Sequence, residues 1–158
     1  MGNRCFFWFD SAVTIATDAI DRLHSTASAH QRVMVIEVMG HKAGWIALHS
    51  GMAGGGDIIL LPEIPFDIHR IGDAIINRLK KGKPYSIVVV AEGIPTIGGK
   101  KAAQYIAEEI EYETGFETRE TVLGYIQRGG SPTAYDRNLA TRMGGHATEL
   151  IAQGMFGR

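Results

Sequence analysis

The sequence predicts an α/β protein with a three-layer architecture, in which a mainly parallel sheet carries helices on both faces. Apolar, β-branched runs of strand length alternate with longer segments that have helical periodicity. The links between these segments are short, as they are in parallel α/β folds. The 158 residues, 45% hydrophobic and 21% charged, correspond to one globular domain with a substantial core, which we expect to span residues 1–158.

The first helix and the first strand follow a short lead-in. Residues 1–9 are expected to be irregular, and Asp10 or Ser11 is a candidate N-cap for a helix whose apolar positions over 12–23 follow helical spacing. The run 32–38, "RVMVIEV", is almost continuously apolar. Such a run is typical of a strand that is buried on both faces of a parallel sheet.

The middle of the chain repeats this alternation twice. A helix is expected over 42–53, and a second buried strand over 57–64 that Pro62 ends. Asp67 can cap the next helix, which Gly82 would stop. The third strand, "YSIVVVA", is again apolar throughout. These segments predict a sheet whose inner strands are shielded from water.

The C-terminal part adds two helices and one strand of different character. A helix is expected over 100–115, where Gly115 stops it, and a last helix over 133–153. Between them, residues 117–124 ("ETRETVLG") alternate polar and apolar side chains. Alternation of this kind predicts an edge strand with one face exposed to water.

The ends of the predicted strands carry the candidate ligand-binding residues. Parallel sheets bind ligands beyond the carboxyl ends of their strands. Arginine offers a forked, permanently charged donor for a phosphate ester, a carboxylate accepts from sugar hydroxyls, and glycine permits close approach. Surface ion pairs are the alternative explanation for an Arg in such a place. The residues expected at this edge, which suit a sugar phosphate, are Glu37, Met39, Gly40, His41, Lys42, Glu92, Gly93, Tyr125 and Arg128.

Composition argues against several classes of function. A net charge of -1 provides no field to attract nucleic acid or an anionic membrane, so neither is an expected partner. The single Cys5 and the six scattered histidines form no disulfide framework and no zinc spacing, so no metal site is expected. No apolar run approaches the ~20 residues of a membrane span. These features fit a protein of the reducing cytoplasm.

Four segments together carry a resemblance to a known family. The segments "SAHQRVMVIEVMGHKAGWIAL", "AGGGDIILLPEIPFD", "VVVAEG" and "ETRETVLGYIQRGGSPTAYDR" closely resemble the phosphofructokinase family from about Asp10 to the last residue. The resemblance implies the sugar-phosphate-binding part of a 6-phosphofructokinase. Such an enzyme transfers a phosphoryl group to the 1-hydroxyl of fructose 6-phosphate in glycolysis. It implies Mg²⁺ with ATP, or alternatively pyrophosphate, as the phosphoryl donor.

The same resemblance assigns roles to individual residues. It implies that Met39 and Gly40 line the sugar pocket and that Glu92 accepts a fructose hydroxyl. It further implies that Arg32 reaches into the pocket of a neighbouring subunit, so a homo-oligomer is expected. The residues that it assigns to the 6-phosphate end are Arg119, Tyr125 and Arg128.

The chain departs from the family pattern at several of these positions. His41, followed by Lys42, stands where the family often has an Arg that stabilises the transferring phosphoryl group, so His41 is the candidate transition-state contact. Tyr125 replaces a His that many members carry. The loop after Glu92, "GIPTIGGKK", is longer, as in the longer and the pyrophosphate-using branches of the family.

A nucleotide effector site is a second expectation that the resemblance implies. Basic residues of that site in bacterial allosteric members align with His24, Lys81, Lys83 and Pro84, and Asp57 lies nearby. Two of these basic positions are lost in the chain. We therefore expect effector control to be weak or absent, with Asp57, Lys81 and Lys83 as its remaining candidate residues.

The family's donor-binding segments have no counterpart in the sequence. The glycine-rich donor loops and the catalytic Asp of the family lie upstream of the region of resemblance, and neither phosphate-loop fingerprint occurs here. We therefore expect no catalytic base in this chain, and a fragment that is inactive alone. A non-catalytic sugar-phosphate-binding module remains an alternative. A dinucleotide-binding oxidoreductase is rejected, because "EVMGHKAG" lacks the required glycine fingerprint.

Overall fold

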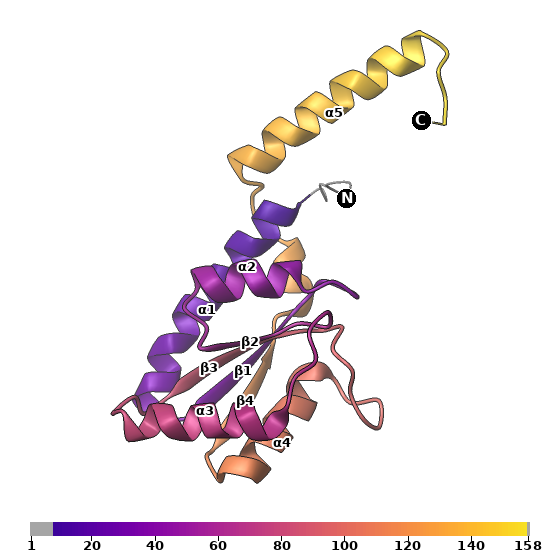
Figure 1. The fold of residues 1–158 in the computed structure, drawn as a ribbon. Helices are drawn as coiled ribbons and strands as arrows, with labels where there is room; N and C mark the ends of the chain where they lie inside the picture. Colours follow the sequence, from indigo (N-terminus) through magenta and orange to yellow (C-terminus); the bar gives the residue numbers. More distant parts are fainter. Residues whose placement is uncertain (1–7, 158) are drawn as a thin grey trace.

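Four parallel strands form one sheet between two layers of helices in the computed structural model, which describes residues 8–157 (Figure 1). The strand order is β2-β3-β1-β4. All pairings between these strands are parallel. The α/β fold class that the sequence predicts is confirmed. The strands are β1 (Val33–Val38), β2 (Ile58–Leu60), β3 (Ser86–Ala91) and β4 (Thr118–Val122).

The centre of the sheet consists of the two strands with the most continuous apolar sequences. Every residue of β1 and β3 is buried. They pair in register from Val33 opposite Ser86 to Val38 opposite Ala91. β-branched side chains dominate both strands, and they pack well on the two faces of a pleated sheet.

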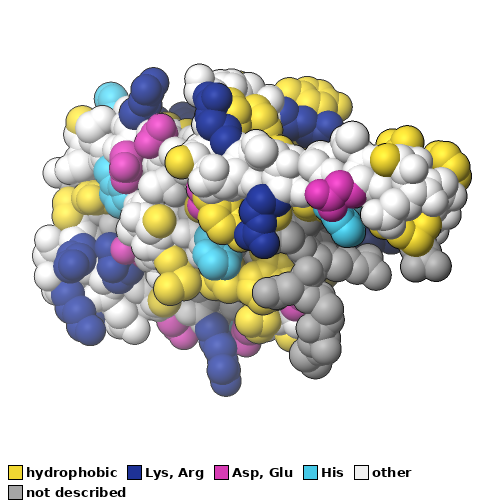
Figure 2. All heavy atoms as spheres, turned by 90° about the horizontal axis from the view of Figure 1, so that it is seen from above, with side chains coloured by type: hydrophobic (Ala, Val, Ile, Leu, Met, Phe, Trp, Pro, Cys, Tyr) yellow, Lys and Arg dark blue, Asp and Glu magenta, His cyan; other side chains and the backbone are white. Residues whose placement is uncertain are grey.

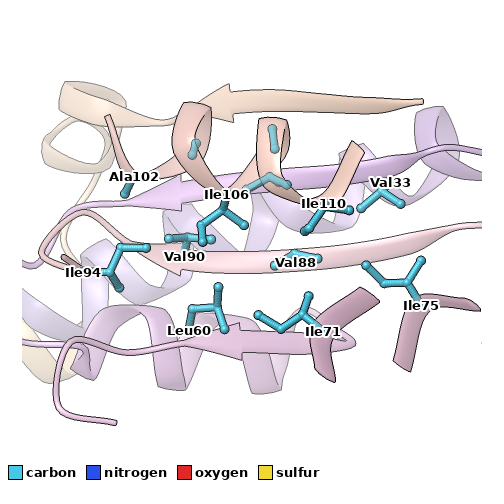
Figure 3. Close-up of a cluster of buried hydrophobic side chains, with 13 residues drawn as sticks. Val33, Leu60, Ile71, Ile75, Val88, Val90, Ile94, Ala102, Ile106 and Ile110 are labelled. Carbon is cyan, nitrogen blue, oxygen red and sulfur yellow. The ribbon is translucent and has the colours of Figure 1, made fainter. Parts of the chain in front are cut away.

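Two helices cover one face of the sheet. These are α3 (Ile68–Lys80) and α4 (Ala102–Thr114). Figure 3 shows the side chains of this layer, where Ile106 and Ile110 of α4 pack with Val88 and Val90 of β3. Two of the predicted helix ends are confirmed. The Asp67 side chain caps the start of α3 by accepting the His69 N–H at 2.9 Å, and Gly115 ends α4 with φ 69°.

The opposite face is covered by α1 (Phe9–His30) and α2 (Trp45–Ala53). Ala16 and Ile20 of α1 are fully buried against this face. The end of α2 approaches α1 very closely, because a Cβ added at Gly54 would lie 2.7 Å from Ile20 Cγ2. A larger residue at position 54 would push the two helices apart.

The start of α1 differs from the prediction. The helix begins at Phe9, so the expected caps Asp10 and Ser11 lie inside its first turn. A residue far along the chain provides the cap instead, because the Asp136 carboxylate accepts the Ser11 N–H at 2.8 Å. The irregular lead-in was predicted over 1–9, but Phe9 is helical, and residues 1–7 lie outside the described part of the chain.

The second strand is shorter and more exposed than predicted. β2 covers only Ile58–Leu60 of the expected 57–64, and two of its three residues are half-buried. Within residues 8–157, it lies at an edge of the sheet and pairs only with β3. Pro62 has no N–H to donate, and the chain turns at residues 62–63. β4 lies at the other edge, as its alternating sequence predicts.

The chain leaves the sheet through two further helices. A 3₁₀-helix, η1 (Gly124–Arg128), follows β4, so Tyr125 and Arg128 lie on a helical turn rather than on a strand. The last helix, α5 (Ala134–Ala152), projects away from the body (Figure 1). Asp136 is the only buried residue of α5, so this helix contributes little to the core.

The contact between α3 and α4 predicts a pH-dependent stability. A hydrogen bond between His69 Nδ1 and Glu113 Oε2, 2.8 Å long, together with the Glu113 charge, raises the pKa of His69 above its ordinary value of 6.5. A raised folded-state pKa means that the stabilisation is complete below about pH 6.5 and is lost as the pH rises through the folded-state pKa. The melting temperature should therefore fall slightly across this window.

Variants at these two residues test the effect by thermal unfolding between pH 6 and 8.5. His69→Gln and Glu113→Gln should each remove the same small pH-dependent change in melting temperature, because each removes one partner of the pair. A wild-type pH profile in either variant would show that the pair does not couple protonation to folding.

Candidate functional site

A pocket of about 550 Å³ opens at the edge of the sheet where the strands have their carboxyl ends. Loops after β1 and β3 and the end of η1 bring five of the predicted substrate-binding residues to its wall. Two strand ends and a 3₁₀-helix far apart in the sequence therefore form one site. The five residues are Met39, Gly40, His41, Glu92 and Arg128.

The Glu92 carboxylate is held by the backbone of the neighbouring loop. Glu92 follows β3 directly, and its N–H donates to Val38 O at 3.0 Å. Its Oε1 atom accepts the N–H groups of Gly40 at 3.0 Å and His41 at 2.6 Å. His41 itself adopts the left-handed conformation, with φ 54°. Oε2 keeps its capacity to accept a hydrogen bond from a ligand.

Two glycines allow these loops to meet. A Cβ added at Gly93 would lie 2.1 Å from His41 O, and one at Gly40 would lie 2.4 Å from Ala43 O. Neither distance is compatible with a real side chain, since the obstructing atoms belong to the backbone. Glycine is therefore needed at both positions to keep Glu92 against the loop after β1.

Gln127 belongs to the site, although the sequence analysis missed it. Its side chain is 1% exposed, and its Oε1 atom accepts the Met39 N–H at 2.7 Å. The residue therefore ties η1 to the end of β1. The only sign of Gln127 in the sequence is its position, as a polar residue between the apolar Ile126 and the candidate phosphate-binding residue Arg128. That signal does not distinguish a buried amide from an exposed one.

The opposite wall of the pocket is apolar and largely aromatic. It is formed by the start of α1 and the start of α2. The Phe9 ring meets the His49 ring edge-on, with 5.4 Å between centroids. Figure 2 looks onto the end from which α5 projects, where hydrophobic side chains lie among Lys and Arg. The apolar lining residues are Trp8, Phe9, Ala12, Trp45 and Ile46.

Tyr125 lies near the pocket but does not line it. Its side chain is 80% exposed, and the Arg128 guanidinium lies 5.7 Å from the centre of its ring. This is a cation–π contact within the usual range. Tyr125 therefore contacts Arg128 from outside the pocket.

Arg32 and Arg119 lie at the other end of the sheet. Arg32 precedes β1, and Arg119 pairs with Met34 in the first half of that strand. Both side chains converge on Glu117, with Arg32 Nη1 at 3.4 Å and Arg119 Nη2 at 2.9 Å from the same Oε1 atom. At ~3.3 Å per residue, the distance along β1 from Met34 to Met39 is about 16 Å. The structure does not bring these two cations to the pocket of their own chain.

The candidate effector residues also lie at the amino end of the strands. The Asp57 carboxylate accepts the Ile87 N–H at 2.9 Å and contacts Arg78 Nη2 at 2.7 Å, so both of its oxygens have partners. Lys81 and Lys83 are exposed at the end of α3. The structure therefore gives Asp57 a structural role, in that it joins α3 to β3.

Glu37 points away from the pocket. This buried residue of β1 accepts the Ala103 N–H at 2.8 Å, at the start of α4. A carboxylate in this position caps the helix and complements its dipole. Glu37 was among the residues expected at the strand ends, and the structure assigns it to the helix instead.

Comparison with known proteins identifies the family. A family model for phosphofructokinase matches residues 2–151. The chain belongs to the phosphofructokinase family. It is 80% identical over 157 residues to the ATP-dependent 6-phosphofructokinase 3 of Bacteroides thetaiotaomicron, covering 99% of this chain and 47% of that protein. It is 48% identical to the pyrophosphate--fructose 6-phosphate 1-phosphotransferase of Amycolatopsis mediterranei, covering 96% of this chain and 49% of that protein.

Solved phosphofructokinase structures share the fold. The Pichia pastoris enzyme in the T-state superposes with a TM-score of 0.78 at 34% identity, over 90% of this chain and 17% of that chain. The pyrophosphate-dependent enzyme of Marinobacter aquaeolei gives a TM-score of 0.75 at 28% identity, over 91% of this chain and 39% of that chain. The chain spans about half the length of the curated relatives it matches.

Two kinds of feature are absent from residues 8–157 of this phosphofructokinase-family chain. Between residues 8 and 157, no three His, Cys, Asp or Glu side chains come together as candidate metal ligands. Within the same range, no helix has the length and apolar character required to cross a membrane.

The close contact at Gly93 predicts that one methyl group added at this position destabilises the folded state. Gly93→Ala would place a Cβ against His41 O, so the loops after β1 and β3 must separate. We expect a loss of about 1–3 kcal/mol in the free energy of unfolding, measured by urea denaturation.

Gly129→Ala is the matched control at the same edge. A Cβ at Gly129 would meet Ile126 O at 3.4 Å, an ordinary contact, and the stability should change by less than about 1 kcal/mol. Equal unfolding midpoints for the two variants would contradict the close approach of the two loops.

Proposed function

We propose that this chain is the fructose 6-phosphate-binding half of a 6-phosphofructokinase, which transfers a phosphoryl group to the 1-hydroxyl of the sugar. One observation carries the proposal. The pocket joins a carboxylate held by the backbone, Glu92, to the Arg128 guanidinium in a single wall. Support comes from the 80% identity to a protein named as an ATP-dependent 6-phosphofructokinase.

The proposed roles follow from the chemistry of each group. Arg128 binds the 6-phosphate through charge-assisted hydrogen bonds, and Tyr125 steadies its guanidinium. Glu92 accepts a hydroxyl of fructose through Oε2. Met39 and Gly40 form the surface against which the sugar lies, since a glycine backbone lets the ring approach closely.

His41 is the proposed contact to the transferring phosphoryl group. Its N–H is engaged by Glu92, which places its side chain at the mouth of the pocket, where it is exposed. Transfer of this kind depends on aligning donor and acceptor and on cations that neutralise the developing charge. We propose that Mg²⁺ with ATP supplies the donor, bound mainly by residues outside this segment.

Arg32 and Arg119 have a proposed role outside the pocket of their own chain. Both lie at the amino end of the strands and share Glu117. We propose that the enzyme is a cytoplasmic homo-oligomer, in which these cations serve the pocket of a neighbouring subunit. Such an arrangement reconciles the phosphate-binding role expected for Arg119 with its distance from Arg128.

Control by a nucleotide effector is proposed to be weak or absent. Lys81 and Lys83 remain as candidate contacts to an effector phosphate. The Asp57 carboxylate, however, is engaged by Arg78 and the Ile87 N–H, which supports a structural role for it.

Replacing Arg128 tests the phosphate contact. In a full-length enzyme that contains this segment, Arg128→Ala should raise the KM for fructose 6-phosphate by about tenfold to a hundredfold, because a charge-assisted hydrogen bond is lost. The KM for the phosphoryl donor should change little. Steady-state kinetics with each substrate varied in turn measure both values.

Arg142→Ala is the matched control for this variant. Arg142 lies on the exposed part of α5, away from the pocket, so both KM values should stay close to wild type. If Arg128→Ala weakens donor and sugar equally, the residue supports the structure rather than the sugar phosphate.

The chain by itself is predicted not to catalyse phosphoryl transfer. It spans about half the length of its curated relatives and supplies only the proposed acceptor site. A coupled assay for fructose 1,6-bisphosphate, with magnesium and either ATP or pyrophosphate, should give no turnover above the blank. Turnover with either donor that Glu92→Ala abolishes would refute this prediction.

The same assay on a full-length enzyme separates the proposal from its alternatives. Turnover with ATP supports the proposed donor, and turnover with pyrophosphate alone assigns the other donor. Binding of fructose 6-phosphate without turnover in the full-length protein would identify a non-catalytic binding module.

A further inference from the structure

Trp8 has a backbone conformation that bulky aromatic residues rarely adopt. Its φ of 71° and ψ of 11° lie in the left-handed region, where the Cβ atom crowds the backbone. Within residues 8–157, the other residues that combine a side chain with a positive φ are Gln31 and His41. Glycine adopts this conformation without crowding. The chain therefore carries a local strain at Trp8 that a glycine would avoid.

The capping of α1 does not explain why a tryptophan stands at this position. Trp8 is the N-cap of the helix, and its side chain makes no capping hydrogen bond. Small polar residues and glycine are preferred at N-caps, and glycine would also remove the strain. Residues that contradict local preferences in this way occur mainly at ligand-binding and active sites. Trp8 is therefore a candidate for a functional role.

Hydrogen bonds in the first turn of α1 hold Trp8 in place. Its carbonyl accepts the Ala12 N–H at 3.0 Å, which closes that turn. The turn is also tied to α5, because Asp136 Oδ2 accepts the Ser11 N–H at 2.8 Å and the Ser11 hydroxyl at 2.6 Å. These contacts fix the backbone on the C-terminal side of Trp8. The residue then forms part of the apolar pocket wall, beside Phe9 and Ala12.

The indole of Trp8 offers the pocket a carbon surface and no hydrogen bond. Its Nε1 atom is closed off from water and has no partner among the described residues, so any part of the ring that is open to the pocket consists of carbon. Glu92 and Arg128 belong to the polar wall of the same pocket. A sugar ring has hydroxyl groups at its edge and C–H groups on its faces. An aromatic wall together with hydrogen-bonding groups therefore suits a sugar better than a bare anion.

We propose that Trp8 is a specificity-determining residue whose indole packs against a C–H face of the bound sugar. The inference rests on the function proposed above, and it places the sugar between this ring and the surface that Met39 and Gly40 form. The indole selects for the sugar ring, whereas Arg128 selects for the phosphate. Kinetics and stability measurements together distinguish this role from packing of the indole against protein outside this segment.

The strain is tested by comparing glycine with alanine at the same position. Trp8→Ala and Trp8→Gly both lose the indole, but only glycine adopts a positive φ without a steric cost. In the 158-residue chain, the urea midpoint should therefore be higher for Trp8→Gly than for Trp8→Ala. Gln31 provides the matched control, because it ends α1 with φ 50° and does not line the pocket. The same order is expected for Gln31→Gly and Gln31→Ala.

The sugar contact is tested in a full-length enzyme that contains this segment. Trp8→Gly and Trp8→Ala should each raise the KM for fructose 6-phosphate about threefold to tenfold, because both remove the indole whatever the backbone conformation. Trp8→Phe keeps an aromatic ring and should stay within about twofold of the wild type. The KM for the phosphoryl donor should stay unchanged in all three variants.

Four results would contradict these expectations. An unchanged KM for fructose 6-phosphate in Trp8→Gly and Trp8→Ala would show that the indole does not contact the sugar. An equal rise in the KM of the donor would show that the indole packs against protein and supports the whole active site. Equal urea midpoints for the two variants would refute the strain. Absence of turnover of fructose 6-phosphate in the wild-type enzyme would instead refute the proposed function, and the role of Trp8 with it.

Discussion

The parallel pairing of β1 with β3 is the constraint on which the rest of the structure depends. Both strands are buried at every residue, so a shift in register would expose apolar side chains to water at one end and bury loop backbone at the other. The pairing of Val38 with Ala91 makes both strands end at the same level. Glu92 therefore emerges beside the loop that begins at Met39.

The site is built by backbone contacts between segments that follow different strands. The Gly40 and His41 N–H groups hold Glu92, and the Met39 N–H holds Gln127. Every residue type has a backbone N–H except proline, so these contacts do not depend on particular side chains. The geometry of the pocket wall that carries Glu92 and Gln127 depends instead on the fold and on the glycines that let the loops approach each other. This explains why Gly93 matters although it carries no functional group.

A buried polar network joins the apolar wall to the segment that carries Arg128. Asp136 at the start of α5 accepts the Ser11 hydroxyl at 2.6 Å and caps α1, and Ser11 Oγ in turn accepts the Thr133 N–H at 3.0 Å. The first turn of α1 supplies Phe9 to the pocket. The two sides of the pocket are thus held together by hydrogen bonds across more than a hundred residues of sequence. Such contacts leave no periodic signal in the sequence.

Local patterns in the sequence determined the order of helices and strands, the parallel sheet, and the edge at which Met39, Glu92 and Arg128 meet. Continuous apolar runs can be buried only in the middle of a layered fold, and parallel strands end on one side. Tertiary structure alone decided that Asp136 caps α1, that Gln127 is buried, and that Arg119 lies with Arg32 far from the pocket. Each of these outcomes depends on which distant segments of the chain pack together. The residues next to a side chain in the sequence do not determine which distant residue will contact it.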